Sequence, residues 1–174
     1  AELRLLLNLS QLLDENPDLS ESGPLVLQTI SEHVDMMRGA IYILRDESAE
    51  ITIEAAFGLS ESALQRGVYG IGEGVVGQVI ASGEPAIVPK VSEESRFLNR
   101  TGARANVPKE EISFICVPVK QGSKIIGALS ADQIYDLDQP LEDDLSLLQT
   151  VATMIAQAVW RHRELQKERH ALLE

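Results

Sequence analysis

The chain has 174 residues, a length that fits one domain, and 44% of them are hydrophobic, which allows one sizeable core. Its formal net charge of −12 excludes functions that depend on clustered Lys and Arg, such as holding nucleic-acid phosphates or a polybasic membrane contact. The single cysteine, Cys116, excludes an internal disulfide framework and favours a reducing, cytoplasmic location. No apolar run approaches the ~20 residues that a membrane-spanning helix needs.

The first segment, residues 3–13, is expected to be a helix with leucines on two sides. A surface helix of a monomer needs only one apolar stripe. The additional stripe, Leu5, Leu9 and Leu12, therefore predicts either a contact with a second subunit or a helix sunk deep in its own core, and both interpretations stay open.

A second helix is expected after the break at Asn16, Pro17 and Asp18. Ser22 is its predicted N-cap and Pro24 falls in the first turn. Residues 38–39, Arg-Gly, are predicted to end this helix.

The middle of the chain predicts strands, because short apolar runs alternate with turn residues. The expected strands are residues 40–44, 51–57, 86–88, 113–119 and 124–132. Short helices are expected at 60–65 and 75–81, and the polar segment 89–108 is expected to be a functional loop. Helices at both ends and hairpins between them predict an α+β domain with an antiparallel sheet.

The last segment, residues 141–172, is expected to be one long helix whose apolar residues alternate in steps of three and four, as in a coiled coil. We expect residues 1–160 to form a regulatory domain and residues 161–174 to project as a signalling or linker extension. Leu148, Ile155 and Leu165 on this helix join the leucines of the first helix as candidates for a homodimer interface.

Residues 72–77 match the dinucleotide pattern G-x-G-x-x-G, but the long following helix and the second parallel strand that this fingerprint needs are missing. We interpret the glycines as a tight turn that leads into a short helix. Backbone N–H groups at its start, Gly74 and Val75, are candidates for contact with an anion.

Three arginines lie in the polar loop of this acidic chain: Arg96, Arg100 and Arg104. They either pair with nearby glutamates or grip a bound carboxylate or phosphate. The dispersed histidines predict no metal site, and a cysteine within an apolar strand is usually a small core residue, so no catalytic residue is expected.

Two stretches of the chain resemble the GAF domain family. They are residues 70–77, Gly-Ile-Gly-Glu-Gly-Val-Val-Gly, and 82–89, Ser-Gly-Glu-Pro-Ala-Ile-Val-Pro, and residues 125–132 are similar to the strand that follows. A narrower resemblance, to the amino-terminal domain of NifA-type activators of nitrogen-fixation genes, rests on residues 97–104 and 112–120. Short matches at 31–33 and 154–159 extend it over nearly the whole chain.

The resemblance implies a GAF-like antiparallel sheet with the N- and C-terminal helices on one face and a loop-capped pocket on the other. It also implies a regulatory domain of a sigma-N-dependent transcription activator, which binds a small, anionic effector and controls a downstream ATPase domain. Some relatives respond to 2-oxoglutarate and some to a regulatory partner protein, and other GAF domains bind cyclic nucleotides. The candidate effector-binding residues are Gly74, Val75, Arg96, Phe97, Arg100, Arg104, Phe114 and Cys116.

Two other functions compete with effector sensing. One is a ligand-free domain that serves only for dimerisation or for docking a partner protein, and it predicts a pocket filled by side chains. The other is a cysteine-based reductase, such as the methionine sulfoxide reductases that share the fold, and a lone cysteine in an apolar strand argues against it.

Overall fold

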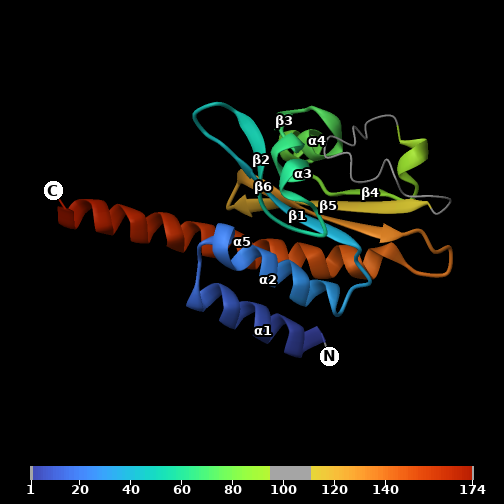
Figure 1. The fold of residues 1–174 in the computed structure, drawn as a ribbon, viewed down its shortest axis with the longest axis horizontal. Helices are drawn as coiled ribbons and strands as arrows, with labels where there is room; N and C mark the ends of the chain where they lie inside the picture. The colour runs from blue at the N-terminus through green and yellow to red at the C-terminus, as the bar shows by residue number, and fades with distance from the viewer. Residues whose placement is uncertain (1, 95–110, 174) are drawn as a thin grey trace.

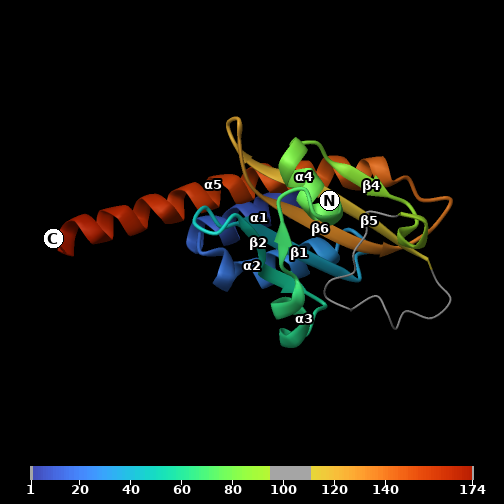
Figure 2. The same cartoon turned by 90° about the horizontal axis from the view of Figure 1, so that it is seen from above.

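The computed structural model of the chain describes residues 2–94 and 111–173. Three helices lie on one side of a six-stranded antiparallel sheet, two of them packed on the sheet and α1 packed on those two, and shorter helices lie on the other side (Figures 1 and 2). The covering helices are α1 (Glu2–Glu15), α2 (Leu19–Ser31) and α5 (Leu141–Leu173), and the shorter ones are α3 (Glu61–Arg66), α4 (Gly74–Ser82) and the 3-10 turn η1 (Val91–Glu93). The predicted α+β fold is confirmed.

The sheet has the strand order β3-β2-β1-β6-β5-β4, and every neighbouring pair is antiparallel. Its strands are β1 (Arg38–Leu44), β2 (Glu50–Phe57), β3 (Tyr69–Gly70), β4 (Ala86–Val88), β5 (Ile112–Gln121) and β6 (Lys124–Ile134). Both predicted hairpins form, β1–β2 and β5–β6, and the second closes through Gly122, whose φ of 60° suits a glycine. The two-residue strand β3 was not expected from the sequence.

Successive side chains of a strand point to opposite faces of the sheet, so the buried residues are divided between two cores. The larger core fills the space between the sheet and α1, α2 and α5, and includes Ile41, Leu129 and Ile155. The smaller core lies between the sheet and α4, and includes Tyr42, Val79 and Phe114. The two faces of the sheet are therefore both buried over much of their area.

The predicted start and end of the second helix are wrong. Asp18 is the N-cap of α2 and its carboxylate accepts a hydrogen bond from the Ser20 N–H at 3.1 Å, whereas Ser22 lies inside the helix and donates to the Asp18 carbonyl. Pro24 is consequently an interior residue. The helix ends at Ser31, and Arg38, predicted as its terminus, is the first residue of the central strand β1.

The glycines of residues 70–77 form a tight turn that leads into the short helix α4, in agreement with the interpretation of the sequence. A Cβ at Gly77 would lie 2.5 Å from the Gly70 carbonyl oxygen, so the turn and the helix can approach this closely only without a side chain. Gly72 N–H donates to the Gly77 carbonyl at 2.8 Å and closes the turn.

Four of the six leucine and isoleucine side chains expected at a dimer interface lie in the core of a single chain. Leu5 is 6% exposed, and Leu9, Leu148 and Ile155 are fully buried. These four are therefore not available to a second subunit, because the stripe of α1 packs against α2 and α5 and the stripe of α5 packs against the sheet. Leu12 is half-buried and Leu165 is 54% exposed.

In the described ranges, 2–94 and 111–173, no helix combines the length and the apolar character required to cross a bilayer. Among these residues no cluster of three or more His, Cys, Asp or Glu side chains is arranged to hold a metal ion.

Candidate functional site

The face of the sheet that packs against α4 carries polar side chains within an otherwise apolar surface. Strand register places Arg38 opposite Asp132, and Asp132 opposite Phe114, in one row across β1, β6 and β5. The next row contains Ser130 opposite Cys116. Side chains in a row share a face, so charged, hydroxyl and aromatic groups meet on this surface.

The charged end of this surface is an ion pair between Arg38 and Asp132. Arg38 Nε donates to Asp132 Oδ2 at 3.0 Å, and the two side chains are 11% and 2% exposed. Arg38 Nη2 is buried, and within the described residues it has no hydrogen-bond partner. Buried polar groups are almost always hydrogen-bonded, so an unpaired guanidinium nitrogen marks a site that lacks one acceptor.

The middle of the surface adds hydroxyl groups and aromatic rings. Ser130 Oγ lies 3.4 Å from Tyr42 Oη in the buried row beside α4. The ring of Tyr69, from the edge strand β3, meets Tyr42 edge-on with centroids 6.0 Å apart. Together with Arg38 and Asp132 these groups form what we call the polar floor: Arg38, Tyr42, Ser130 and Asp132.

Four of the predicted effector-binding residues lie in or beside this region. Gly74 and Val75 are buried in the first turn of α4, and Phe114 and Cys116 lie in β5, with 1% and 0% exposed. Phe114, Cys116 and Val75 belong to one apolar cluster with α4. The other four lie outside the described residues: Arg96, Phe97, Arg100 and Arg104.

Arg38 and Asp132 were not predicted as site residues from the sequence. Arg38 was assigned to a helix terminus, although it directly precedes an apolar strand. Asp132 stands at the end of the run Ala128-Leu-Ser-Ala-Asp132, and a charged residue that continues an apolar strand is a signal for a buried, paired group. Only the strand register shows that the two residues are partners.

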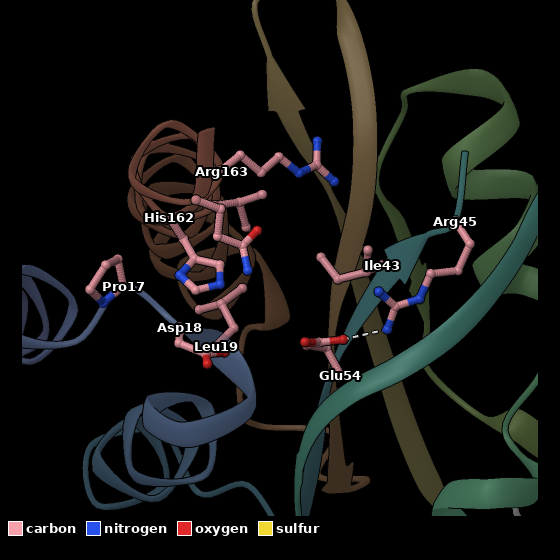
Figure 3. Close-up of a pocket in the computed structure, with 10 residues that line it drawn as sticks. Pro17, Asp18, Leu19, Ile43, Arg45, Glu54, His162 and Arg163 are labelled. Atoms are coloured by element: carbon pink, nitrogen blue, oxygen red, sulfur yellow. Dashed lines mark hydrogen bonds and ion pairs between the residues drawn. The ribbon is translucent and has the colours of Figure 1, made fainter. Parts of the chain in front are cut away.

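A hollow lies on the opposite side of the sheet from the polar floor, where α5 leaves the domain (Figure 3). Its volume is about 220 Å³. We call it the α5-root cavity, and it is lined by Pro17, Asp18, Leu19, Ile43, Arg45, Glu54, Val159, His162, Arg163 and Gln166.

The root of α5 is fastened to the domain on the side of α1. Arg161 Nη2 donates to the Leu13 carbonyl at 3.0 Å and pairs with Asp14 at 3.2 Å. On the hairpin side, Gln121 Nε2 donates to the Ala156 carbonyl at 3.3 Å. Beyond this point the helix extends away from the sheet, as Figures 1 and 2 show.

The match to a known family covers most of the chain. The sequence profile described as "GAF domain" matches residues 18–159, so the chain belongs to the GAF domain family. The sheet order and the helices on both faces agree with this assignment.

The similar curated proteins include a nitrogen fixation protein and a Nif-specific regulatory protein. The chain is 37% identical over 158 residues to the nitrogen fixation protein VnfA of Azotobacter vinelandii, a match that covers 90% of this chain and 30% of that protein. It is 32% identical over 174 residues to the Nif-specific regulatory protein of Azospirillum brasilense, covering 99% of this chain and 28% of that protein. The chain thus spans about a third of the length of these relatives, and the predicted resemblance to NifA-type regulators is confirmed.

Solved structures with the same fold include both regulatory domains and enzymes. The GAF domain of A. aeolicus nlh2 in an inactive state superposes with a TM-score of 0.79 at 21% identity, covering 93% of this chain and 96% of that one. A free methionine-R-sulfoxide reductase from Neisseria meningitidis, in complex with its substrate, has a TM-score of 0.76 at 19% identity, covering 94% and 91%. At these identities the likeness shows the fold alone.

Cys116 is poorly suited to the chemistry of a reductase. Its side chain is fully buried in β5, and burial raises the pKa of the thiol far above its usual range. Because the thiolate is the nucleophile, a neutral thiol without access to solvent is unreactive. The position supports the interpretation of Cys116 as a core residue.

Proposed function

We propose that the chain is the sensory GAF domain of a sigma-N-dependent transcription activator, that it binds a small, anionic effector on the α4 face of the sheet, and that it thereby controls a downstream ATPase domain. The similarity to regulators of nitrogen fixation supports the regulatory role. The observation that carries the effector site is the buried Nη2 of Arg38 in the polar floor, which has no hydrogen-bond partner among residues 2–94 and 111–173.

The polar floor supports an anion in preference to a neutral ligand. A guanidinium group that has one edge on Asp132 still presents hydrogen-bond donors to a carboxylate or phosphate oxygen. Arg96, Arg100 and Arg104 remain candidates for the remaining charge of the effector, and Phe97 remains a candidate for contact with it. The candidate effectors are 2-oxoglutarate and a cyclic nucleotide.

Titration calorimetry with 2-oxoglutarate, cyclic AMP and cyclic GMP tests this proposal. We expect one ligand to bind the native chain, and Arg38→Lys to weaken its binding by about tenfold or more, because lysine keeps the charge and loses Nη2. Absence of binding by all three, with no small molecule released on denaturing the purified chain, would refute the effector site.

A second function is favoured by the packing of the α4 face. Val75, Phe114 and Cys116 are at most 3% exposed and belong to one apolar cluster, as expected for a domain used only for dimerisation or docking. The same titrations separate the two functions, since a docking domain binds none of these ligands.

We also propose that the chain forms a homodimer through the exposed side chains of its terminal helices. Leu3 and Leu7 of α1, and Leu165 and Leu172 of α5, are between 54% and 87% exposed. Leu165 and Leu172 are seven residues apart, the spacing of a coiled-coil seam. Sedimentation velocity at low concentration should give a dimer, and Leu165→Glu with Leu172→Glu should give a folded monomer; a native chain that sediments as a monomer would contradict the proposal.

A further inference from the structure

We propose that the α5-root cavity is a second ligand site, separate from the polar floor, which binds a small organic monocarboxylate through Arg163 and His162. Binding would join the root of α5 to strands β1 and β2. The site lies on the face of the sheet that carries α2 and α5, whereas the polar floor lies on the face that carries α4.

The size of the cavity restricts what it can hold. Its volume is about 220 Å³. Ligand pockets for larger metabolites usually measure about 300–1,000 Å³. A carboxylate with a short aliphatic chain fits the volume of the cavity.

The lining combines an apolar floor with polar walls. Leu19, Ile43 and Val159 are buried and form the apolar part, while His162 and Arg163 are half-buried and project from α5 (Figure 3). Such a division suits a ligand with one apolar end and one polar end.

The polar walls have hydrogen-bond donors without acceptors. Figure 3 shows Arg45 directed to Glu54, with which it forms an ion pair, and Asp18 accepts from the start of α2. The side chains of Arg163 and His162 have no hydrogen bond or ion pair within the described residues. Within the described residues Glu54 is paired with Arg45, the Asp18 carboxylate caps α2, and Arg163 is the cation of the lining that has no ionic partner.

The charges of the lining favour a monocarboxylate over phosphate. A guanidinium group binds the two oxygens of a carboxylate in parallel, and a neutral histidine can donate one more hydrogen bond. Asp18 and Glu54 line the same cavity, and their negative charges repel a dianion more strongly than a monoanion. The short chain of the ligand would cover Ile43 and Val159.

The position of the site gives its binding a mechanical effect. α5 supplies Val159, His162, Arg163 and Gln166 to one wall, while β1, β2 and the start of α2 supply the others. Arg161 already holds α5 on the side of α1. A ligand in the cavity would hold the helix on a second side and reduce the angular freedom of its projecting half.

Sodium butyrate is the probe that tests the site, titrated at constant ionic strength against sodium chloride and followed by amide ¹H–¹⁵N shifts in α5 and by the Arg163 Nε–H signal. We expect saturable shifts with butyrate, weaker binding of inorganic phosphate and none of butyramide, which lacks the charge. Arg163→Gln should lower the affinity for butyrate by about tenfold or more, since a charge-assisted hydrogen bond is lost.

Matched variants distinguish binding in this cavity from a general attraction of anions to the helix. Arg169→Gln removes an exposed cation from the same helix outside the cavity and should leave binding unchanged. Gln166→Glu places a carboxylate at the rim and should weaken butyrate binding. Circular dichroism confirms that each variant is folded.

The proposal is overturned if butyrate gives no saturable shift, if Arg163→Gln binds it as well as the native chain does, or if butyramide binds equally. Loss of binding in Arg169→Gln would also overturn it, because it would show a diffuse charge effect. The proposed effector site is unaffected by these outcomes, since its own test uses different ligands and Arg38.

Discussion

The buried ion pair between Arg38 and Asp132 gives the sharpest test of the polar floor. Asp132→Asn leaves the guanidinium of Arg38, only 11% exposed, without a countercharge on the adjacent strand. Removing one partner of a buried pair typically costs about 3–5 kcal/mol, because the remaining charge stays desolvated. For a domain of this size, ~2–4 °C per kcal/mol converts this loss into a fall in melting temperature of about 6–20 °C.

A double-mutant cycle separates the loss of the pair from the cost of leaving one charge behind. The double variant Arg38→Met with Asp132→Leu removes both charges. Its loss of unfolding free energy should be smaller than the sum of the losses in the single variants Arg38→Met and Asp132→Leu. Glu54→Gln breaks the more exposed pair with Arg45 and serves as the control, with an expected loss of about 1 kcal/mol or less.

Urea denaturation followed by circular dichroism measures these free energies, with constant m-values as evidence of two-state unfolding. A loss of less than about 1 kcal/mol of unfolding free energy for Asp132→Asn would refute the reasoning, because an unpaired charge in a buried site destabilises a fold by more than this. If the free-energy losses of the two single variants added up to the loss of the double variant, the two side chains would act independently.

Three further predictions concern packing and the thiol. Leu148→Ala should cost about 2–5 kcal/mol in urea denaturation, because the side chain is fully buried, whereas Leu165→Ala, which is 54% exposed, should change the stability of the monomer by about 0.5 kcal/mol or less; equal losses would contradict the core assignment. Gly77→Ala should lower the melting temperature, because its Cβ would lie 2.5 Å from a backbone oxygen, and an unchanged melting temperature would show that the turn relaxes freely. Cys116 should react with a thiol reagent only after unfolding, and a fast reaction in the native state would show that the thiol is reachable. The difference in unfolding free energy between the native chain and Cys116→Ala should become smaller above pH ~8.5, because the thiol loses its proton in the unfolded state at a lower pH than in the folded state.

The sequence predicted the strands and the long helix well because their signals are local. The hairpin β5–β6 follows from two apolar runs and a turn with glycine, and both features lie within about 20 residues. The extent of α2 was predicted poorly, because Asp18 and Ser22 are both good N-caps and Met37 happens to continue the helical spacing. Packing of Arg38 against β6 decided where the strand begins.

The sites were less predictable than the fold, because each depends on residues that are distant in sequence. Arg38 and Asp132 are 94 residues apart, and only the central position of β1 beside β6 brings them together. The α5-root cavity similarly needs four elements, and neither His162 nor Arg163 differs in sequence context from other polar residues of a long helix. The leucines of α1 could not be divided between core and surface until the position of α5 was known.

The continuity of α5 has a geometric consequence for any signal that it carries. α5 is one unbroken helix from Leu148 and Ile155, which are buried in the core, to the exposed Leu165 and Leu172, so the sheet sets the rotational phase of the projecting leucines. Each added residue turns these leucines by about 100° and advances them by about 1.5 Å. A seven-residue insertion after Val159 would therefore keep the leucines on nearly the same side, whereas a two-residue insertion would turn them about 200° away. The number of residues between the sheet and the tip is thus as much a part of the coupling as their identity.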